Sequence, residues 1–157
     1  MALNHLRPDG TAHMIDVSEK QVSARSATAR GVVRMAPHAV QALRGGTVPK
    51  GDALGVARLA GIQAAKRTPE LVPLAHPVAV HAVEVDLEVT DDGVEITATV
   101  RTADRTGVEM EALTCVSVAA LAMVDMIKAV DKASTIDNVR VTAKSGGRSG
   151  DWVRGEP

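Results

Sequence analysis

The sequence predicts an α+β fold in which helices pack on one face of an antiparallel sheet. Residues 83–89 and 94–101 alternate apolar and polar side chains on either side of Asp92-Gly93, which is typical of two half-buried strands joined by a hairpin turn. Residues 52–66 and 108–130 are rich in small and apolar residues over lengths that suit buried helices. At 157 residues, with 45% apolar and 24% charged, the composition is that of one compact domain.

The first half of the chain is expected to contain one strand and two helices. Residues 1–26 are polar and are predicted to be irregular, and a strand is predicted over 27–35. Pro37 then begins a short helix that ends at Gly45-Gly46, because proline suits the first helical position and glycine the position after the last. The helix over 52–66 is expected to have Asp52 as its N-cap and to stop before Pro69.

The second half is expected to hold the hairpin, a long helix over 108–130, a strand over 139–143 and a loop-like tail over 144–157. The order is strand, helices, strand, strand, helix, strand. That order is the split βαβ, or ferredoxin-like, arrangement. We therefore expect a single ferredoxin-like domain over residues 1–157, without internal repeats.

Composition argues against several classes of partner. The formal net charge is -1 and Trp152 is the only aromatic residue, so a basic patch with base-stacking side chains is not expected, nor is a nucleic-acid partner. Cys115 is the only cysteine, which fits a reducing compartment. The start, MALNHLRPDG, lacks the apolar core of a signal peptide. The uncharged run 112–124 is shorter than the roughly 20 residues that span a bilayer. We expect a cytoplasmic protein without a membrane partner.

The long helix carries ionisable residues at both ends. Glu109 and Glu111 at its start and Lys128 at its end would compensate the helix dipole, whereas Asp125 would oppose it. Asp125 and Lys128 are three residues apart and therefore neighbours on the helix. They form either an exposed ion pair of little energetic value or an acid/base couple.

Helix geometry separates these two ends. Glu111 and Asp125 lie roughly 21 Å apart along the helix axis, too far to serve one small substrate within one copy. Either two separate sites exist, or a second subunit supplies one end. The helix is also apolar on nearly every side, and one sheet can cover only part of it. We therefore expect a homo-oligomer with its site at the subunit interface.

One histidine lies in a restrained segment. The tripeptide 74–76, Leu-Ala-His, lies between Pro73 and Pro77, which restrict the backbone around His76. An isolated histidine is more often structural than functional, but with a proline on either side the two interpretations are about equally supported. No HExxH motif or multi-histidine spacing supports a metal site.

Several cations could gather around a polyphosphate. The stretch AKSGGRSG (143–150) places Lys144 and Arg148 among glycines and serines, which can wrap phosphates with backbone N–H groups or form a flexible polar tail. Lys20, Arg25 and Lys50 add positive charge from other segments. Sequence position alone does not show whether these cations converge.

Seven stretches, in order, carry a resemblance to a known family: HMIDVS (13–18), KGD (50–52), ARLAGIQAAKRT (57–68), LVPLAHP (71–77), TGVEMEALT (106–114), DMIKAV (125–130) and AKSGGRSGD (143–151). Together they resemble the MoaC family of cyclic pyranopterin monophosphate synthases, which act in molybdenum cofactor (molybdopterin) biosynthesis. The resemblance implies a ferredoxin-like fold, a homohexamer built as a trimer of dimers, and sites between subunits.

The resemblance also implies a reaction. The substrate would be 3′,8-cyclo-7,8-dihydro-GTP, supplied by an upstream radical enzyme, and the products cyclic pyranopterin monophosphate and pyrophosphate, which makes the enzyme a lyase. Rearranging a purine to a pterin needs proton transfers and no redox step, so no organic cofactor is expected. Mg²⁺ is compatible with the substrate phosphates, although no dedicated protein cage for it is evident.

Residue roles follow from the matching motifs. The resemblance implies catalytic roles for Asp125, Lys128, Lys50 and Lys144. It implies substrate binding by Leu74, Ala75, His76, Met110, Glu111, Glu109, Lys66, Lys20, Arg25 and Asp16. The chain departs from the common pattern at Ala75, where many relatives have Cys, and at Arg148, where Lys is common.

Three rival interpretations remain open. A ferredoxin-like nucleotide sensor would keep the phosphate-binding cations without needing an Asp125–Lys128 couple. A degenerate family copy would act only in assembly, but the intact motifs argue against it. A nucleotide pyrophosphatase would accept plain GTP and depend strictly on a metal.

Overall fold

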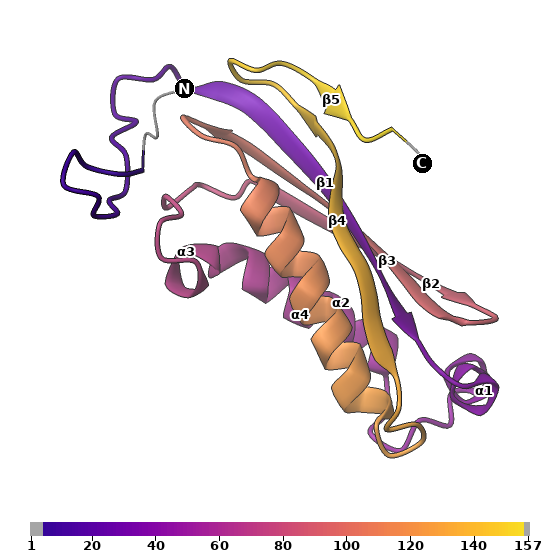
Figure 1. Cartoon of the computed structure of the whole chain (residues 1–157). Coiled ribbons are helices and arrows are strands. Elements are labelled where there is room, and N and C mark those ends of the chain that lie inside the picture. The colour runs from indigo at the N-terminus through magenta and orange to yellow at the C-terminus, as the bar shows by residue number, and fades with distance from the viewer. Residues whose placement is uncertain (1–4, 156–157) are drawn as a thin grey trace.

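The computed structural model describes residues 5–155, so the ends of the predicted domain, 1–4 and 156–157, lie outside it. The elements in chain order are β1 (Ser23–Arg34), α1 (Pro37–Gly45), α2 (Ala53–Lys66), α3 (Thr68–Leu71), β2 (Ala82–Thr90), β3 (Gly93–Asp104), α4 (Glu109–Ile127), β4 (Thr135–Ser145) and β5 (Trp152–Val153). The strands form one antiparallel sheet in the order β2-β3-β1-β4-β5 (Figure 1). The order of the first four confirms the predicted ferredoxin-like class.

The ends of the first two helices follow from local sequence. α1 begins at Pro37 and is closed by Gly46, whose φ of 67° is the left-handed conformation that glycine adopts readily. α2 is capped by Asp52, whose Oδ1 accepts a hydrogen bond of 2.9 Å from the Gly55 N–H. Both predicted helix starts are confirmed.

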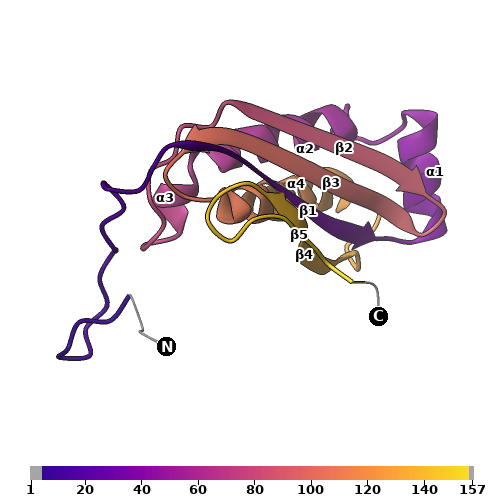
Figure 2. The ribbon, with the colours of Figure 1, turned by 90° about the horizontal axis from the view of Figure 1, so that it is seen from above.

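The core lies between one face of the sheet and the helices. α4 packs on the sheet, and α2 packs beside it, against both α4 and β2 (Figure 2). Small residues set the spacing between the two helices, because a Cβ added at Gly61 would lie 2.9 Å from the Cys115 carbonyl oxygen. By length and composition α4 could cross a membrane, but half of its apolar window is buried inside the protein, where it is the core helix.

The start of the first strand and the C-terminal part of the chain differ from the sequence prediction. β1 begins at Ser23, so the N-terminal irregular segment is shorter than 1–26. The tail 144–157 is not wholly loop-like, because Lys144 belongs to β4 and pairs with both Ala27 of β1 and Trp152 of β5. These polar stretches show no clear alternation of apolar and polar residues. They are strands because their backbones form hydrogen bonds with neighbouring strands. Residues 5–20 extend away from the sheet on the side where β1 begins (Figures 1 and 2).

Candidate active site

A carboxylate at the end of α4 binds two lysines. Lys50 Nζ lies 3.0 Å from both oxygens of Asp125, and Lys128 Nζ lies 2.8 Å from Asp125 Oδ1. Lys50 comes from the turn after α1, which the Gly51 N–H closes by donating to the Val48 carbonyl at 3.0 Å. We call Asp125, Lys50 and Lys128 the Asp125 cluster. All three side chains remain about half exposed and can therefore reach a ligand.

The Asp125 cluster has a defined protonation state. Hydrogen bonds from Lys128 and then Lys50 lower the pKa of Asp125 below its ordinary value. The Asp125 carboxylate in turn raises the pKa of Lys128 above 10.5. At neutral pH Asp125 is therefore ionised and Lys128 is an ammonium that can donate a proton.

A second charged group, the Lys144 cluster, lies at the start of α4. Lys144 Nζ lies 3.6 Å from Glu109 Oε1 and donates to Ser149 Oγ at 2.7 Å. Lys20 and Arg25 line the same small pocket of about 200 Å³. The Lys144 cluster consists of these five residues and places three cations beside one carboxylate.

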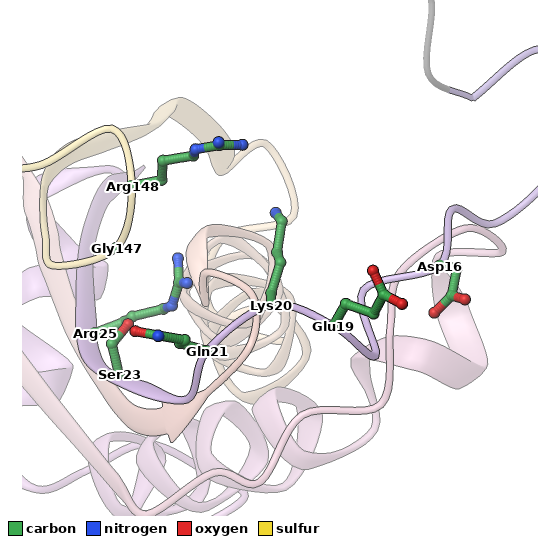
Figure 3. A pocket seen from close by; sticks show the side chains of 8 residues that line it. All are labelled: Asp16, Glu19, Lys20, Gln21, Ser23, Arg25, Gly147 and Arg148. Atoms are coloured by element: carbon green, nitrogen blue, oxygen red, sulfur yellow. The ribbon is translucent and has the colours of Figure 1, made fainter.

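An open cleft of about 900 Å³ adjoins the Lys144 cluster. Figure 3 shows Lys20 and Arg25, from the start of β1 and the residues before it, and Arg148, from the loop after β4, around this cleft, with Asp16 and Glu19 farther along. The structure therefore brings the predicted phosphate-binding cations of this end together. Such a concentration of positive charge suits a polyphosphate.

Glycines give the loop that carries Arg148 its shape. Gly146 and Gly147 have φ of 81° and 78°, and a Cβ there would collide with the Ala24 carbonyl and the Arg25 guanidinium, respectively. Asp151 Oδ1 accepts a hydrogen bond of 3.1 Å from the Gly146 N–H and closes the loop. The loop can thus lie directly on the start of β1.

The predicted histidine segment meets the N-terminal segment. His76 Nε2 donates to the Ile15 carbonyl at 2.5 Å. A groove of about 490 Å³ runs between them and is lined also by Asp16 and Asp104. Hydrogen bonds from Ser18 lower the pKa of Asp16, which stays ionised. The groove is a third polar surface, and it is near the cleft because Asp16 lines both.

Other predicted binding residues lie outside these groups. Glu111 is only 3% exposed, its Oε2 has no hydrogen-bond partner among the described residues, and burial raises its pKa to about 7. Lys66 ends α2 at the surface and belongs to neither cluster. Met110 and Leu74 are exposed apolar side chains, and Ala75 is half-buried.

The structure adds polar residues that sequence reasoning did not single out. Ser149 and Asp151 bind within the 143–151 loop, and their presence in that motif was the available signal. Asp104 lines the His76 groove, where its Oδ2 accepts from the Ala79 N–H at 3.0 Å. No motif marks Asp104, which is brought there by the end of β3. Within residues 5–155, no group of three or more His, Cys, Asp or Glu side chains is arranged to hold a metal ion.

Fold and site together define a class: a ferredoxin-like α+β protein with a carboxylate–lysine couple at one end of its core helix and a cationic cleft at the other. The family model of the MoaC family matches residues 14–147. The chain belongs to the MoaC family.

Curated relatives match nearly the whole chain. A protein of Streptomyces coelicolor named cyclic pyranopterin monophosphate synthase is 64% identical over 97% of this chain and 89% of its own length. A Nocardioides protein of the same name is 62% identical, covering 97% and 95% of the two chains. A Mycobacterium tuberculosis protein named cyclic pyranopterin monophosphate synthase 2 is 55% identical, covering 97% and 91%.

Proposed function

We propose that the protein is a synthase that converts 3′,8-cyclo-7,8-dihydro-GTP to cyclic pyranopterin monophosphate and pyrophosphate in molybdenum cofactor biosynthesis. The observation that carries the proposal is the 64% identity, over 97% of the chain, to a relative named cyclic pyranopterin monophosphate synthase. The reaction is a lyase reaction, and its substrate comes from an upstream radical enzyme. It takes place in the cytoplasm, without a nucleic-acid or membrane partner.

The Asp125 cluster supplies the acid/base chemistry. Lys128, held as an ammonium by Asp125, donates a proton as the purine ring opens or the pterin ring closes. Lys50 is hydrogen-bonded to the same carboxylate and is a second proton carrier. Asp125 stays ionised and orients both amines. This division of roles needs no organic cofactor.

The cationic cleft holds the triphosphate. Lys20, Arg25 and Arg148 line it, and Lys144 lies in the adjoining pocket. Closing a cyclic phosphate requires the reacting phosphorus to be held in line with a ribose-derived hydroxyl. Fixed cations around the leaving pyrophosphate meet that requirement, and Mg²⁺ can accompany the phosphates as part of the substrate.

The complete site is shared between two subunits. Glu109 and Asp125 lie 16 residues apart on α4 (125 − 109 = 16), or about 24 Å. Ser117, at the midpoint, is exposed, and Leu121 beside it is 59% exposed. An antiparallel α4 pair about a two-fold axis near Ser117 would bring Asp125 of one subunit to the Lys144 cluster of the other. The oligomer is a hexamer arranged as a trimer of dimers.

One assay tests the reaction. The purified protein is incubated anaerobically with 3′,8-cyclo-7,8-dihydro-GTP, and pyrophosphate and the cyclic pterin phosphate are measured by mass spectrometry. Both products are expected. Tight binding without either product would favour the nucleotide-sensor interpretation. Metal-dependent pyrophosphate release from plain GTP, run in parallel, would favour the pyrophosphatase.

A further inference from the structure

Two side chains tie the turn after α4 to the start of α1. Asp131 Oδ2 accepts a hydrogen bond of 2.8 Å from the Ala36 N–H, and its Oδ1 accepts one of 2.9 Å from the Ala133 N–H. His38 Nε2 donates to the Val130 carbonyl at 2.9 Å. We call the Asp131–Ala36 and His38–Val130 contacts the α1–α4 tie. It lies within three residues of Lys128.

The tie joins the same two parts of the chain that meet at the Asp125 cluster. α1 leads directly into the turn that carries Lys50, while Asp125 and Lys128 belong to the end of α4. In Figure 1 α1 lies beyond the end of the sheet, and its first residues meet the turn after α4 through the α1–α4 tie. We expect a movement of the start of α1 away from the turn after α4 to shift Lys50 relative to Asp125, because the chain between α1 and the cap of α2 carries Lys50.

The Lys50–Asp125 contact cannot fix that position by itself. Both side chains are about half exposed, and exposed ion pairs contribute little free energy. A lysine side chain also has considerable rotamer freedom to lose. The Asp131 carboxylate is better held, because both of its oxygens accept backbone N–H groups, from two different segments.

We propose that Asp131 and His38 are positioning residues, which hold Lys50 against Asp125 by tying α1 to the end of α4. Their importance for turnover rests on the proposed function, whereas their effect on Lys50 does not. Neither side chain is assigned to the substrate. Both act through the backbone on which Lys50 and Asp125 are mounted.

The direct test measures the reactivity of Lys50 without turnover. The full chain is labelled briefly with acetic anhydride, and acetylation of each lysine is measured by peptide mass spectrometry, with Lys66 as internal reference. Asp131→Ala and His38→Ala should each increase Lys50 labelling several-fold, because an amine no longer held against both Asp125 oxygens is more accessible to the reagent. His38→Gln keeps an N–H donor and should restore slow labelling.

Asp137→Ala is the matched control. It removes another exposed aspartate, which binds Arg34 at 2.8 Å between β4 and β1, without touching the α1–α4 tie. Lys50 labelling should match wild type in this variant. Unchanged Lys50 labelling in folded Asp131→Ala and His38→Ala, with circular dichroism as the check of folding, would overturn the proposal.

Kinetics then connect the tie to the reaction. Asp131→Ala should lower kcat about tenfold with little change in KM, since general acid–base groups contribute 10²–10⁴-fold and misplacement removes part of that. A purely structural role would lower the melting temperature without this split between kcat and KM. A different outcome is that the wild-type protein makes no pterin while the two variants still show faster Lys50 labelling. That combination would overturn only the proposed reaction and would leave the positioning role intact.

Discussion

Asp125 stands near the C-terminal end of α4, where the helix dipole disfavours a carboxylate. Two ammonium groups offset this, since Lys50 and Lys128 both donate to it. Removing either lysine weakens the stabilisation of the carboxylate, and removing the carboxylate leaves two lysines in mutual repulsion. The three residues are therefore best understood as one unit, and substitutions within it should not be additive.

Lys128→Ala should abolish turnover and leave the oligomer intact. The side chain is about half exposed, so its loss creates no cavity, while the loss of a proton donor should cost at least 10²-fold in kcat. Product formation by mass spectrometry and mass by light scattering measure the two effects. Lys132→Ala, an exposed lysine four residues on, is the control. A folded, fully active Lys128→Ala protein would refute the catalytic role.

Glu111 should make the protein less stable as the pH rises. Its folded pKa of about 7 exceeds the ordinary 4.5, so between these values the folded state binds more protons than the unfolded state and stability falls with pH. Glu111→Gln mimics the protonated form. It should lie within about 1 kcal/mol of wild type at pH 5 and exceed it at pH 8 by about 3 kcal/mol.

Urea unfolding at pH 5 and pH 8 measures this difference in the free energy of unfolding. Equal responses of wild type and Glu111→Gln to pH would show that the buried carboxyl is not the cause. Hydrogen bonds lower the pKa of Asp125 and Asp131, so these two carboxylates stabilise the folded state. That stabilisation is lost only in the acid range, as the pH falls through their lowered pKa values.

At the scale of elements, the contact of α2 with α4 depends on small residues. Ala57 and Gly61 of α2 and Ala119 of α4 are buried, which lets the backbones approach closely. In a chain with a single aromatic residue, the core is filled by close approach of its elements. The position of α2 also matters for the site, because Lys50 lies two residues before its N-cap, Asp52.

Gly61→Ala should destabilise the fold by about 1–3 kcal/mol, the usual cost of overpacking. The new Cβ would lie 2.9 Å from a backbone oxygen of Cys115 and 3.1 Å from the Ala119 side chain, and neither can move without shifting a helix. Gly45→Ala, with its nearest atom 3.9 Å away, is the control and should be neutral or slightly stabilising. Thermal unfolding of both variants measures the two effects on stability. Equal melting temperatures would contradict tight packing at Gly61.

At the scale of the whole molecule, a shared site can be tested by complementation. Lys128→Ala and Lys144→Ala proteins are each expected to be inactive. If each site takes Lys128 from one subunit and Lys144 from the other, a mixed dimer has one intact site. Random co-assembly of the two variants should then restore about a quarter of wild-type turnover.

Co-expression of the two variants with different affinity tags supplies the mixed assemblies, and turnover per subunit is the measurement. Two Lys128→Ala chains co-expressed in the same way are the control and should stay inactive. Recovery no higher than this control, from assemblies shown by mass to be mixed, would place both lysines of a site in one subunit.

Much of the fold could be predicted from local pattern. The hairpin at Asp92-Gly93, the cap at Asp52 and the stop at Gly46 are decided by neighbours in the chain, and the structure confirms each. The extent of β1 and the existence of β5 could not be predicted. Residues such as Ser23 and Trp152 join the sheet because strands distant in the sequence form hydrogen bonds with them. The local pattern of apolar and polar residues carries no signal of such pairing.

The sequence by itself determined the class of fold, the separation of the two charged ends of α4 and the family. Local propensity, helix rise and ordered motifs suffice for these. The tertiary structure alone decided that Lys50 binds Asp125, that Lys144 faces Glu109, and that Glu111 is buried. Such contacts depend on how α1, α4 and β4 pack. Packing brings residues up to 75 positions apart in the sequence within a few ångströms of each other.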